Sequence, residues 1–132
     1  MFAKARRMRD DSWIVGYPVI CQKNHYIIPK DAEEVTLIPI RKDTICRYTG
    51  KDLPDGQNVY ENDIIEIADA DGAKIRGIVR FGTYHNEFDT KETGHVGFFV
   101  DWETNKYWRK DLGYWIDSER VLYVGNTADS DF

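Results

Sequence analysis

Short runs of β-branched and aromatic residues dominate the hydrophobic pattern of this chain, and the polar positions between them are rich in turn formers. Each run is too short for a helix, and no segment keeps an apolar stripe with a period of about 3.6 residues over three turns. Such residues are typical of strands, which pack a pleated, half-buried face. We therefore expect strands at Trp13–Cys21, His25–Ile28, Val35–Ile40, Phe98–Trp102, Tyr114–Ile116 and Arg120–Gly125.

The clearest local unit is a β-hairpin between Asp63 and Phe81. The segments DIIEIA and KIRGIVRF alternate in part between apolar and polar residues, and they flank Asp69-Ala70-Asp71-Gly72. Asp and Gly adopt the tight-turn conformations that this connection needs. A second turn is expected at Leu53-Pro54-Asp55-Gly56, because Pro presets the first central position and Gly accepts the left-handed one.

The pattern as a whole predicts an all-β fold of mostly antiparallel strands. Six to eight short strands would close as a small barrel or pack as a barrel-like sandwich, with room for one short helix. At 132 residues and 15.4 kDa the chain has the size of one ordinary domain, so we expect a single domain over residues 1–132. Within it we expect a basic, flexible N-terminus at residues 1–10, a polar loop at Gly82–Gly97 and a loose polar tail at Asn126–Phe132.

Neither a membrane segment nor a secretory signal stands out in the sequence. No run approaches the roughly 18 apolar residues of a membrane helix, and the basic start Met1–Asp10 lacks the apolar segment of a signal peptide. We expect a cytoplasmic protein that does not bind membranes. Cys21 and Cys46 are then expected to be reduced thiols, and two cysteines give poor support for structural zinc, so we expect neither a metal site nor a cofactor.

Charge is divided unevenly along the chain, whose formal net charge is −5. Residues 1–50 carry nine Lys and Arg against six Asp and Glu, whereas residues 51–132 carry nine against seventeen. The acidic part would repel a nucleic acid, so we favour a protein partner. Nucleic acid is the alternative, because clustered cations could contact phosphate at Lys4, Arg6, Arg7 and Arg9. A basic face would reverse this order if it gathered Arg6, Arg7, Arg41, Lys42 and Arg47.

The polar loop Gly82–Gly97 holds the side chains best suited to acid–base chemistry, which are His85, Glu87, Asp89 and His95. An enzyme that uses this loop is therefore an alternative, on the condition that at least two of these groups converge on one pocket. Ordinary loop polarity explains the same residues. The sequence lacks the glycine scaffolds of a phosphate-binding loop, a dinucleotide fold or a hydrolase elbow, so we assign no catalytic residue.

An aromatic segment interleaved with cations is the best candidate for a binding surface. Its members are Tyr107, Trp108, Arg109, Tyr114 and Trp115. Bases or proline-rich peptides stack on such rings, and cations hold phosphate beside them. Trp and Tyr also fill the core and rim of small β domains or a contact between subunits, and this alternative stays open.

Several segments resemble the signature of the YopX family of phage and prophage proteins. Asp43–Gly50 (DTICRYTG) is similar to the family's T-x-x-x-Y-T-G, and Asp55-Gly56 is similar to its D-x-x-G turn. Val59–Ile65 (VYENDII) is similar to I-[YF]-E-G-D-I-[IV]. Ser12–Tyr17 and Val124–Asn126 are similar to the family's early tryptophan–glycine strand and its closing V-x-G-N.

The resemblance implies a small, mostly β, barrel-like fold with SH3-like character, encoded by a phage, a prophage or the bacterium that harbours it, and it implies no known reaction. Asn62 stands where the family has glycine, and Asn tolerates a left-handed backbone, so we expect the turn to be kept. We interpret the motif residues as architectural, through ring packing, turns and hydrogen bonds to turn amides. They are Tyr48, Thr49, Gly50, Asp55, Gly56, Tyr60, Glu61, Asn62 and Asp63.

The function expected from these observations is that of a non-enzymatic phage or prophage accessory protein. Aromatic density without a catalytic constellation favours a module that binds another macromolecule and self-associates as a homo-oligomer. A structural oligomer without any ligand is a further alternative, because function belongs to sites and not to folds.

Overall fold

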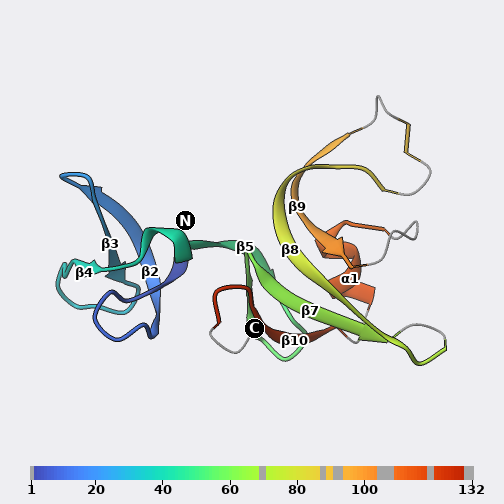
Figure 1. Ribbon diagram of the computed structural model, residues 1–132, viewed down its shortest axis with the longest axis horizontal. Coiled ribbons are helices and arrows are strands. Elements are labelled where there is room, and N and C mark those ends of the chain that lie inside the picture. Colours follow the sequence, from blue (N-terminus) through green and yellow to red (C-terminus); the bar gives the residue numbers. More distant parts are fainter. Residues whose placement is uncertain are drawn as a thin grey trace. The chain divides into compact units, whose positions relative to one another are not determined.

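The computed structural model describes residues 2–68, 71–86, 89–90, 94–103, 109–118 and 121–129, and the structural statements below concern these residues. Within them the chain forms ten strands, one short 3-10 helix and one α-helix (Figure 1). The strand registers are antiparallel. The predicted all-β, mostly antiparallel fold is therefore confirmed.

The chain divides into two compact units, residues 1–48 and residues 49–132. Each unit has a hydrophobic core of its own, one around Ala5 and Ile14 and the other around Ile65 and Val79. We expected a single domain, because length and composition do not report how many cores a chain builds. The division falls where the charge changes, so the first unit is the basic one and the second is the acidic one.

The first unit is an antiparallel sheet that bends back on itself. Its strands are β1 (Ala3–Arg6), β2 (Trp13–Cys21), β3 (Asn24–Pro29), β4 (Ile38–Pro39) and the first part of β5 (Cys46–Asp52), which the 3-10 helix η1 (Lys42–Thr44) precedes. Their order is β4-β3-β2-β1-β5. A β-bridge joins Arg7, just after β1, to Ile40, just after β4. The sheet thus closes on itself, which makes the unit barrel-like.

Small residues let this unit close around a narrow core. In the β1–β2 register Ala3 pairs with Gly16 and Ala5 pairs with Ile14, and alternation along the strands places all four on one face. Ala3 and Ala5 are completely buried. A Cβ built on Gly16 would lie 2.0 Å from the carbonyl oxygen of Ile28, so only glycine allows β2 and β3 to approach this closely.

The N-terminal residues, which we expected to be flexible, are part of the sheet. Ala3–Arg6 form β1, which lies between β2 and β5, and Lys4 and Arg6 are buried. Lys4 Nζ and Arg6 Cζ lie 4.8 and 4.7 Å from the ring centroid of Trp13. The basic composition concealed a strand pattern in which small apolar residues alternate with cations that pack on a ring.

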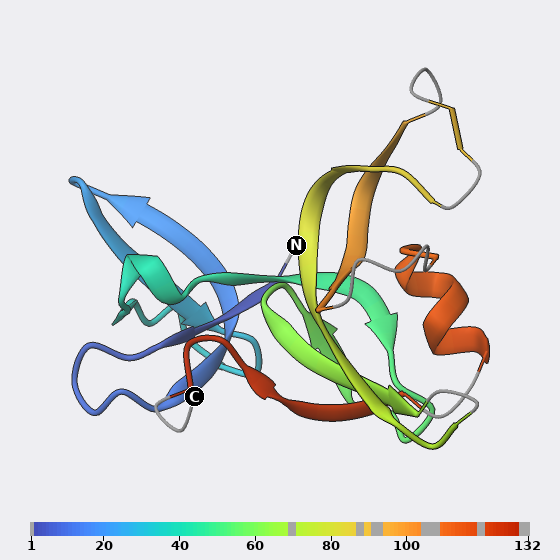
Figure 2. The same ribbon diagram turned by 45° about the vertical axis from the view of Figure 1, so that its right-hand side comes forward.

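The second unit is built on a four-stranded sheet with the order β10-β7-β8-β9. Strands β7 (Asp63–Ala68) and β8 (Lys74–Tyr84) form the predicted hairpin, and β9 (His95–Trp102) and β10 (Leu122–Asn126) are the edges of the sheet. The end of β5 pairs with β6 (Asn58–Tyr60). Helix α1 (Leu112–Ser118) lies on the β9 side of this sheet (Figures 1 and 2).

Residues Tyr114–Ile116 lie in α1, which corrects the prediction of a strand there. Leu112 and Ile116 stand four residues apart, and both are buried in the core of the second unit. This i, i+4 spacing of apolar residues is helical. Because α1 has only 7 residues, its apolar stripe is too short to show a period in the sequence.

Two segments that we expected to be irregular also contain strands. Strand β8 runs to Tyr84 and β9 begins at His95, so three residue pairs of the β8–β9 ladder lie inside the expected loop Gly82–Gly97. Asn126, which we placed in a loose tail, ends β10 and is completely buried. Polar composition concealed these strand ends, because their residues pair through backbone groups whatever their side chains.

Candidate functional site

A cluster of polar side chains gathers where β8 ends and β9 begins, in the second unit. We call it the Asp111 cluster, and its members are Tyr84, Asn86, Asp89, His95, Arg109 and Asp111. Two backbone contacts attach the Arg109–Asp111 segment to β9: Phe99 forms a bridge with Asp111, and Val100 N donates to the carbonyl oxygen of Lys110 at 2.9 Å. The sheet edge therefore positions this segment.

The carboxylate of Asp111 accepts three hydrogen bonds. Its donors are the Tyr84 hydroxyl at 2.5 Å, Asn86 Nδ2 at 3.1 Å and Arg109 Nε at 2.9 Å. Burial raises the pKa of Asp111, but the hydrogen bonds from Tyr84, Arg109 and Asn86 outweigh burial, so the pKa lies below its ordinary value. Asp111 is thus a charged acceptor that holds β8 to the Arg109 segment.

Asp89 and His95, two of the four acid–base candidates of the polar loop, are in contact. Asp89 Oδ2 lies 3.1 Å from His95 Nε2 and also accepts from the backbone N of Asn86 at 2.8 Å. His85 is exposed, and Glu87 lies outside the described residues. One pair of these side chains is therefore in contact and could exchange a proton, but neither residue lines a pocket found in the described part of the chain, so the condition set for an enzyme is met only in part.

Three rings stack along one face of β8 and β9. The Tyr84 ring lies between those of His95 and Phe99, with centroids 5.3 and 5.2 Å away. In the β8–β9 register, the pair Gly82–Gly97 lies between the pair that contains Tyr84 and the pair that contains Phe99. Because glycine has no side chain, the rings of Tyr84 and Phe99 can meet over this glycine pair. The stack holds the phenol of Tyr84 toward Asp111.

The Tyr84 hydroxyl keeps its proton to high pH. Burial, together with the hydrogen bond to Asp111 and the charge of that carboxylate, raises the pKa of Tyr84 from 10.0 to about 12. A pKa that is higher in the folded state contributes stability below pH 10 that is lost as the pH rises through the folded-state value. We therefore expect the Asp111 cluster to open between these two pH values.

A spectrophotometric titration of phenolate absorbance tests this expectation. Tyr84→Phe should remove one late-titrating tyrosine, whereas Asp111→Asn should move that tyrosine to lower pH because the acceptor loses its charge. Tyr60, whose pKa burial also raises, provides an internal reference that stays late in both variants. An unchanged late phase in Tyr84→Phe would contradict the hydrogen bond to Asp111.

The Arg109 segment also carries the described part of the predicted aromatic surface. The indole nitrogens of Trp102 and Trp115 both donate to the carbonyl oxygen of Arg109, at 3.1 and 2.5 Å. Arg109 Cζ lies 4.8 Å from the ring centroid of Tyr114. Trp115 packs edge-on against Trp102 and Tyr114, with centroids 5.0 and 5.2 Å apart. Arg109, Tyr114 and Trp115 thus form one fixed surface, the Arg109–Trp115 surface, while Tyr107 and Trp108 lie outside the described residues.

Within the predicted motif, Thr49, Gly50, Asp55 and Gly56 shape the chain around β5 and β6. Thr49 Oγ1 donates to the carbonyl oxygen of Val59 at 2.8 Å, which ties β5 to β6. Gly50 and Gly56 have φ values of 81° and 92°, the left-handed region that favours glycine. Asp55 Oδ1 accepts from the backbone N of Gln57 at 3.0 Å, as in an Asx turn. Tyr48 stacks on Phe2 in the first unit, with centroids 4.5 Å apart.

The turn from Tyr60 to Asp63 is fixed by a buried hydrogen-bond network. Asp63 Oδ2 accepts from the backbone N of Tyr60 at 2.8 Å, which is the turn contact expected of this aspartate. Asn62 has φ of 68°, so it occupies the left-handed position of this turn, as expected from its residue type. Asp63 Oδ1 accepts from Asn126 Nδ2 at 2.8 Å, and the same nitrogen lies 3.3 Å from the carbonyl oxygen of Glu61.

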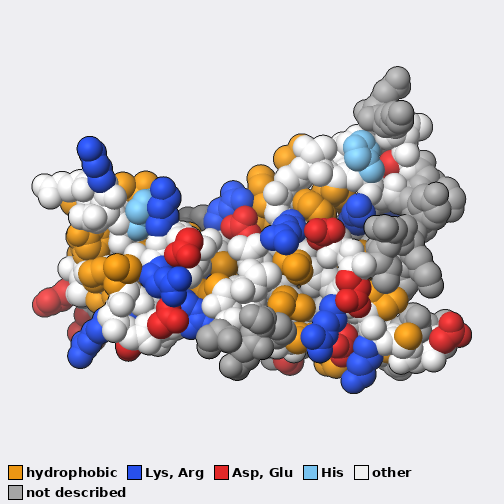
Figure 3. All heavy atoms as spheres, viewed as in Figure 1, with side chains coloured by type: hydrophobic (Ala, Val, Ile, Leu, Met, Phe, Trp, Pro, Cys, Tyr) orange, Lys and Arg blue, Asp and Glu red, His pale blue; other side chains and the backbone are white. Residues whose placement is uncertain are grey.

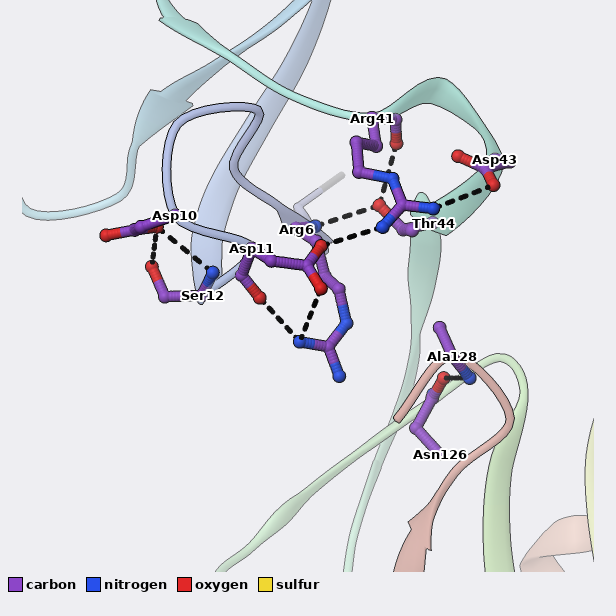
Figure 4. A network of polar contacts seen from close by, with 9 residues as sticks. All are labelled: Arg6, Asp10, Asp11, Ser12, Arg41, Asp43, Thr44, Asn126 and Ala128. Carbon is purple, nitrogen blue, oxygen red and sulfur yellow. Dashed lines mark hydrogen bonds and ion pairs between the residues drawn. The ribbon is translucent and has the colours of Figure 1, made fainter. Parts of the chain in front are cut away.

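Asn126 secures the end of the second unit's last strand. Besides its bond to Asp63, its Oδ1 accepts from Ala128 N at 2.9 Å (Figure 4), and its backbone N donates to Asp129 Oδ2 at 2.8 Å. We expected Asn126 in the closing motif and at the start of a loose tail, and its polar side chain at the end of an apolar strand was the signal of a buried partner.

The arginines proposed for a basic face are partly neutralised. Arg41 Nη1 lies 2.8 Å from Asp11 Oδ1, and Arg41 Nη2 lies 3.4 Å from Asp43 Oδ2. Arg6 Nη1 contacts the same Asp11, both its carboxylate and its carbonyl oxygen (Figure 4). In the face that Figure 3 shows, basic and acidic side chains intermingle over each unit. The condition for preferring nucleic acid is therefore not met by Arg6 and Arg41.

Three members of the Asp111 cluster were not singled out from the sequence: Tyr84, Asn86 and Asp111. Neither their spacing nor their neighbours set them apart, because Asp111 meets its partners on β8 and beyond it only through the fold. Cys21 is exposed, Cys46 is buried, and both are free thiols.

The described residues contain no group of three or more His, Cys, Asp or Glu side chains that could hold a metal ion. Among the same residues, no helix has the length and apolar character needed to cross a membrane. Compared with protein-family models, with curated proteins and with solved structures, the chain matches none of them.

Proposed function

We propose that this protein is a YopX-like accessory protein of a phage or prophage, a non-enzymatic module that binds another protein in the bacterial cytoplasm. The family assignment rests on the resemblance of the segments from Asp43 to Ile65, and this resemblance implies an SH3-like character for the fold. The observation that carries the binding role is the Arg109–Trp115 surface.

This surface has the composition and rigidity of a protein-binding hot spot. Trp, Tyr and Arg are the residues enriched where binding energy concentrates. Tyr114 is 45% exposed and the Arg109 side chain is 50% exposed, so both can meet a partner. Two indole hydrogen bonds hold the Arg109 backbone, so little conformational freedom is lost on binding.

Charge favours a protein over a nucleic acid as this partner. The Arg109–Trp115 surface lies in the second unit, in which Asp and Glu outnumber Lys and Arg by seventeen to nine. A polyanion that stacked on Tyr114 would be repelled by this excess at moderate salt. A protein with complementary charge would instead be steered toward it.

An acid–base enzyme is the second candidate function, because Asp89 and His95 are in contact. The cluster around them supports it less well. The Asp111 carboxylate is occupied by three donors, and the Tyr84 hydroxyl beside it keeps its proton. These groups are arranged to hold the Arg109 segment and not to react.

Affinity capture from bacterial lysate with matched tyrosine variants tests the proposal. The full chain serves as bait, with and without nuclease, beside Tyr114→Ala and the control Tyr17→Ala. Tyr17 is 44% exposed but lies in the first unit, so the control loses an equally exposed ring elsewhere. We expect a protein to be retained equally after nuclease, to be lost by about tenfold or more in Tyr114→Ala, and to be kept in Tyr17→Ala.

Other outcomes separate the alternatives. Nucleic acid retained at moderate salt, with proteins lost after nuclease, would overturn the order of partners. Equal retention by Tyr114→Ala and wild type would exclude the Arg109–Trp115 surface. Recovery of the chain itself, confirmed by light scattering, would identify the partner as a second copy.

A further inference from the structure

An apolar groove flanked by two arginines lies on the first unit. It has a volume of about 480 Å³, and its lining residues are Arg7, Met8, Arg9, Asp10, Ile38 and Pro39. We call it the Arg7–Pro39 groove. All of its residues belong to the unit that carries the excess of positive charge.

Backbone hydrogen bonds fix both walls of this groove. One wall is the turn after β1, where Arg7 N donates to Ser12 O at 2.9 Å and Asp11 N donates to Arg7 O at 3.0 Å. The other wall is β4, which is joined to the turn by a bond of 3.1 Å from Met8 N to Pro39 O. The groove is therefore preformed, and a ligand would not have to order it.

The charges around the groove are unevenly neutralised. Asp11 lies against Arg6 and Arg41, as described above, whereas the guanidinium groups of Arg7 and Arg9 have no ion-pair partner among the described residues. Arg7 Nε is moreover buried without a hydrogen-bond acceptor in this part of the chain. The guanidinium groups of Arg7 and Arg9 are therefore the charges that a ligand of opposite sign would meet in this groove.

The one carboxylate in the groove is already engaged. Asp10 Oδ1 accepts from Ser12 Oγ at 2.6 Å and from Ser12 N at 3.1 Å, and these bonds, followed by the nearby charges of Arg7 and Arg9, lower the pKa of Asp10. Asp10 thus closes its own turn and keeps its charge. Two arginines against one aspartate leave the groove with a net positive charge.

We propose that the Arg7–Pro39 groove binds an acidic peptide segment that carries an apolar side chain. Carboxylates would pair with the guanidinium groups of Arg7 and Arg9, whose planar forks match carboxylate geometry. The apolar side chain would lie on Met8, Ile38 and Pro39, where the flexible thioether of Met8 adapts to its shape.

The lining residues favour a peptide over a nucleic acid. Single-stranded nucleic acid is held by aromatic rings on which bases stack, together with a basic track for the backbone. None of the described residues that line this groove is aromatic. Apolar contacts beside a small number of cations suit a peptide in which acidic and apolar residues alternate.

The Arg7–Pro39 groove and the Arg109–Trp115 surface are independent of each other. The groove lies within residues 1–48 and that surface within residues 49–132, and they share no residue. Loss of partner binding in Tyr114→Ala therefore leaves the groove untouched, and loss of peptide binding at the groove leaves the Arg109–Trp115 surface untouched.

Fluorescence anisotropy with labelled peptides tests the groove directly on the full chain. The probe is a short peptide in which leucines are flanked by Asp and Glu, and the matched probe has Asn and Gln in their place. We expect the acidic peptide to bind at least about tenfold more tightly than its neutral counterpart, and binding to weaken as salt is added. Arg7→Gln with Arg9→Gln should weaken acidic-peptide binding by about tenfold or more.

A matched variant separates the groove from general charge. Lys23→Gln with Lys42→Gln removes the same charge from exposed positions of the first unit outside the groove, and it should leave binding within about twofold of wild type. If Arg7→Gln prevents folding, Arg9→Gln alone carries the test, because Arg9 is exposed. Equal binding of the two peptides, equal losses in both double variants, or preferential binding of a labelled oligothymidylate would each overturn the proposal.

Discussion

Replacing Asp63 with alanine is expected to lower the free energy of unfolding by about 3 kcal/mol, because it breaks a buried hydrogen-bond network at its charged centre. Asp63 is completely buried and accepts from Tyr60 N and from Asn126 Nδ2, both at 2.8 Å. Without the carboxylate, the backbone N–H of Tyr60 and the amide of Asn126 lose a charged acceptor at a site where water does not replace it.

The loss should appear mainly in the second unit, to which all of these residues belong. Urea unfolding followed by circular dichroism measures the change. Asp55→Ala is the matched control, since Asp55 also accepts a backbone N–H in a turn but is exposed, and it should cost less than about 1 kcal/mol. Equal effects of the two variants would mean that the network around Asp63 contributes no more than a surface turn.

Features that depend on neighbours in the chain could be predicted from the sequence. The strand at Trp13–Cys21 and the hairpin of β7 and β8 follow from alternation and turn residues within a few positions. Asn62 was expected in a left-handed turn and has φ of 68°, because its residue type tolerates this conformation. By contrast β1, β5 and β6 were not predicted, since they are short or polar and owe their structure to pairing with distant strands.

The candidate site depends on contacts between residues far apart in the chain, which local sequence patterns do not predict. Asp111 meets Tyr84 across 27 positions of the chain, and Asp63 meets Asn126 across 63. Asp89 and His95 are 6 residues apart and were proposed together, but loop polarity explained them equally well. What distinguishes Asp111 is the number of donors that the fold brings to it, which no local pattern reports.

The division into two units is visible in the sequence as a change of charge, which we interpreted only in terms of the binding partner. The change from basic to acidic composition near residue 50 bears on the partner, and it also coincides with the boundary between the units at 48 and 49. The smaller core was hard to recognise, because Ala3, Ala5 and Gly16 contribute little apolar volume. A narrow barrel-like unit needs such small residues, so its core carries a weak hydrophobic signature.

This narrowness makes Gly16 a sensitive position of the first unit. A Cβ at Gly16 would lie 2.0 Å from the carbonyl oxygen and 2.8 Å from the carbonyl carbon of Ile28, and both are backbone atoms that cannot turn aside as a side chain would. Gly16→Ala must therefore push β2 and β3 apart at the end of their ladder, where Gly16 pairs with Pro29. We expect it to lower the free energy of unfolding by about 3 kcal/mol or more, at the upper end of overpacking effects.

Gly113→Ala is the matched control for this substitution, because its Cβ would meet only the end of Lys51 at 3.7 Å and Ala is the better helix former in α1. It should leave the protein unchanged or stabilise it by up to about 1 kcal/mol. Amide resonances in two-dimensional NMR spectra, recorded during urea unfolding, locate the effect. In Gly16→Ala the native resonances of residues 1–48 should disappear at a lower urea concentration than in wild type. An unchanged urea midpoint for these residues would mean that β2 and β3 separate without cost, contrary to the register that closes the first unit.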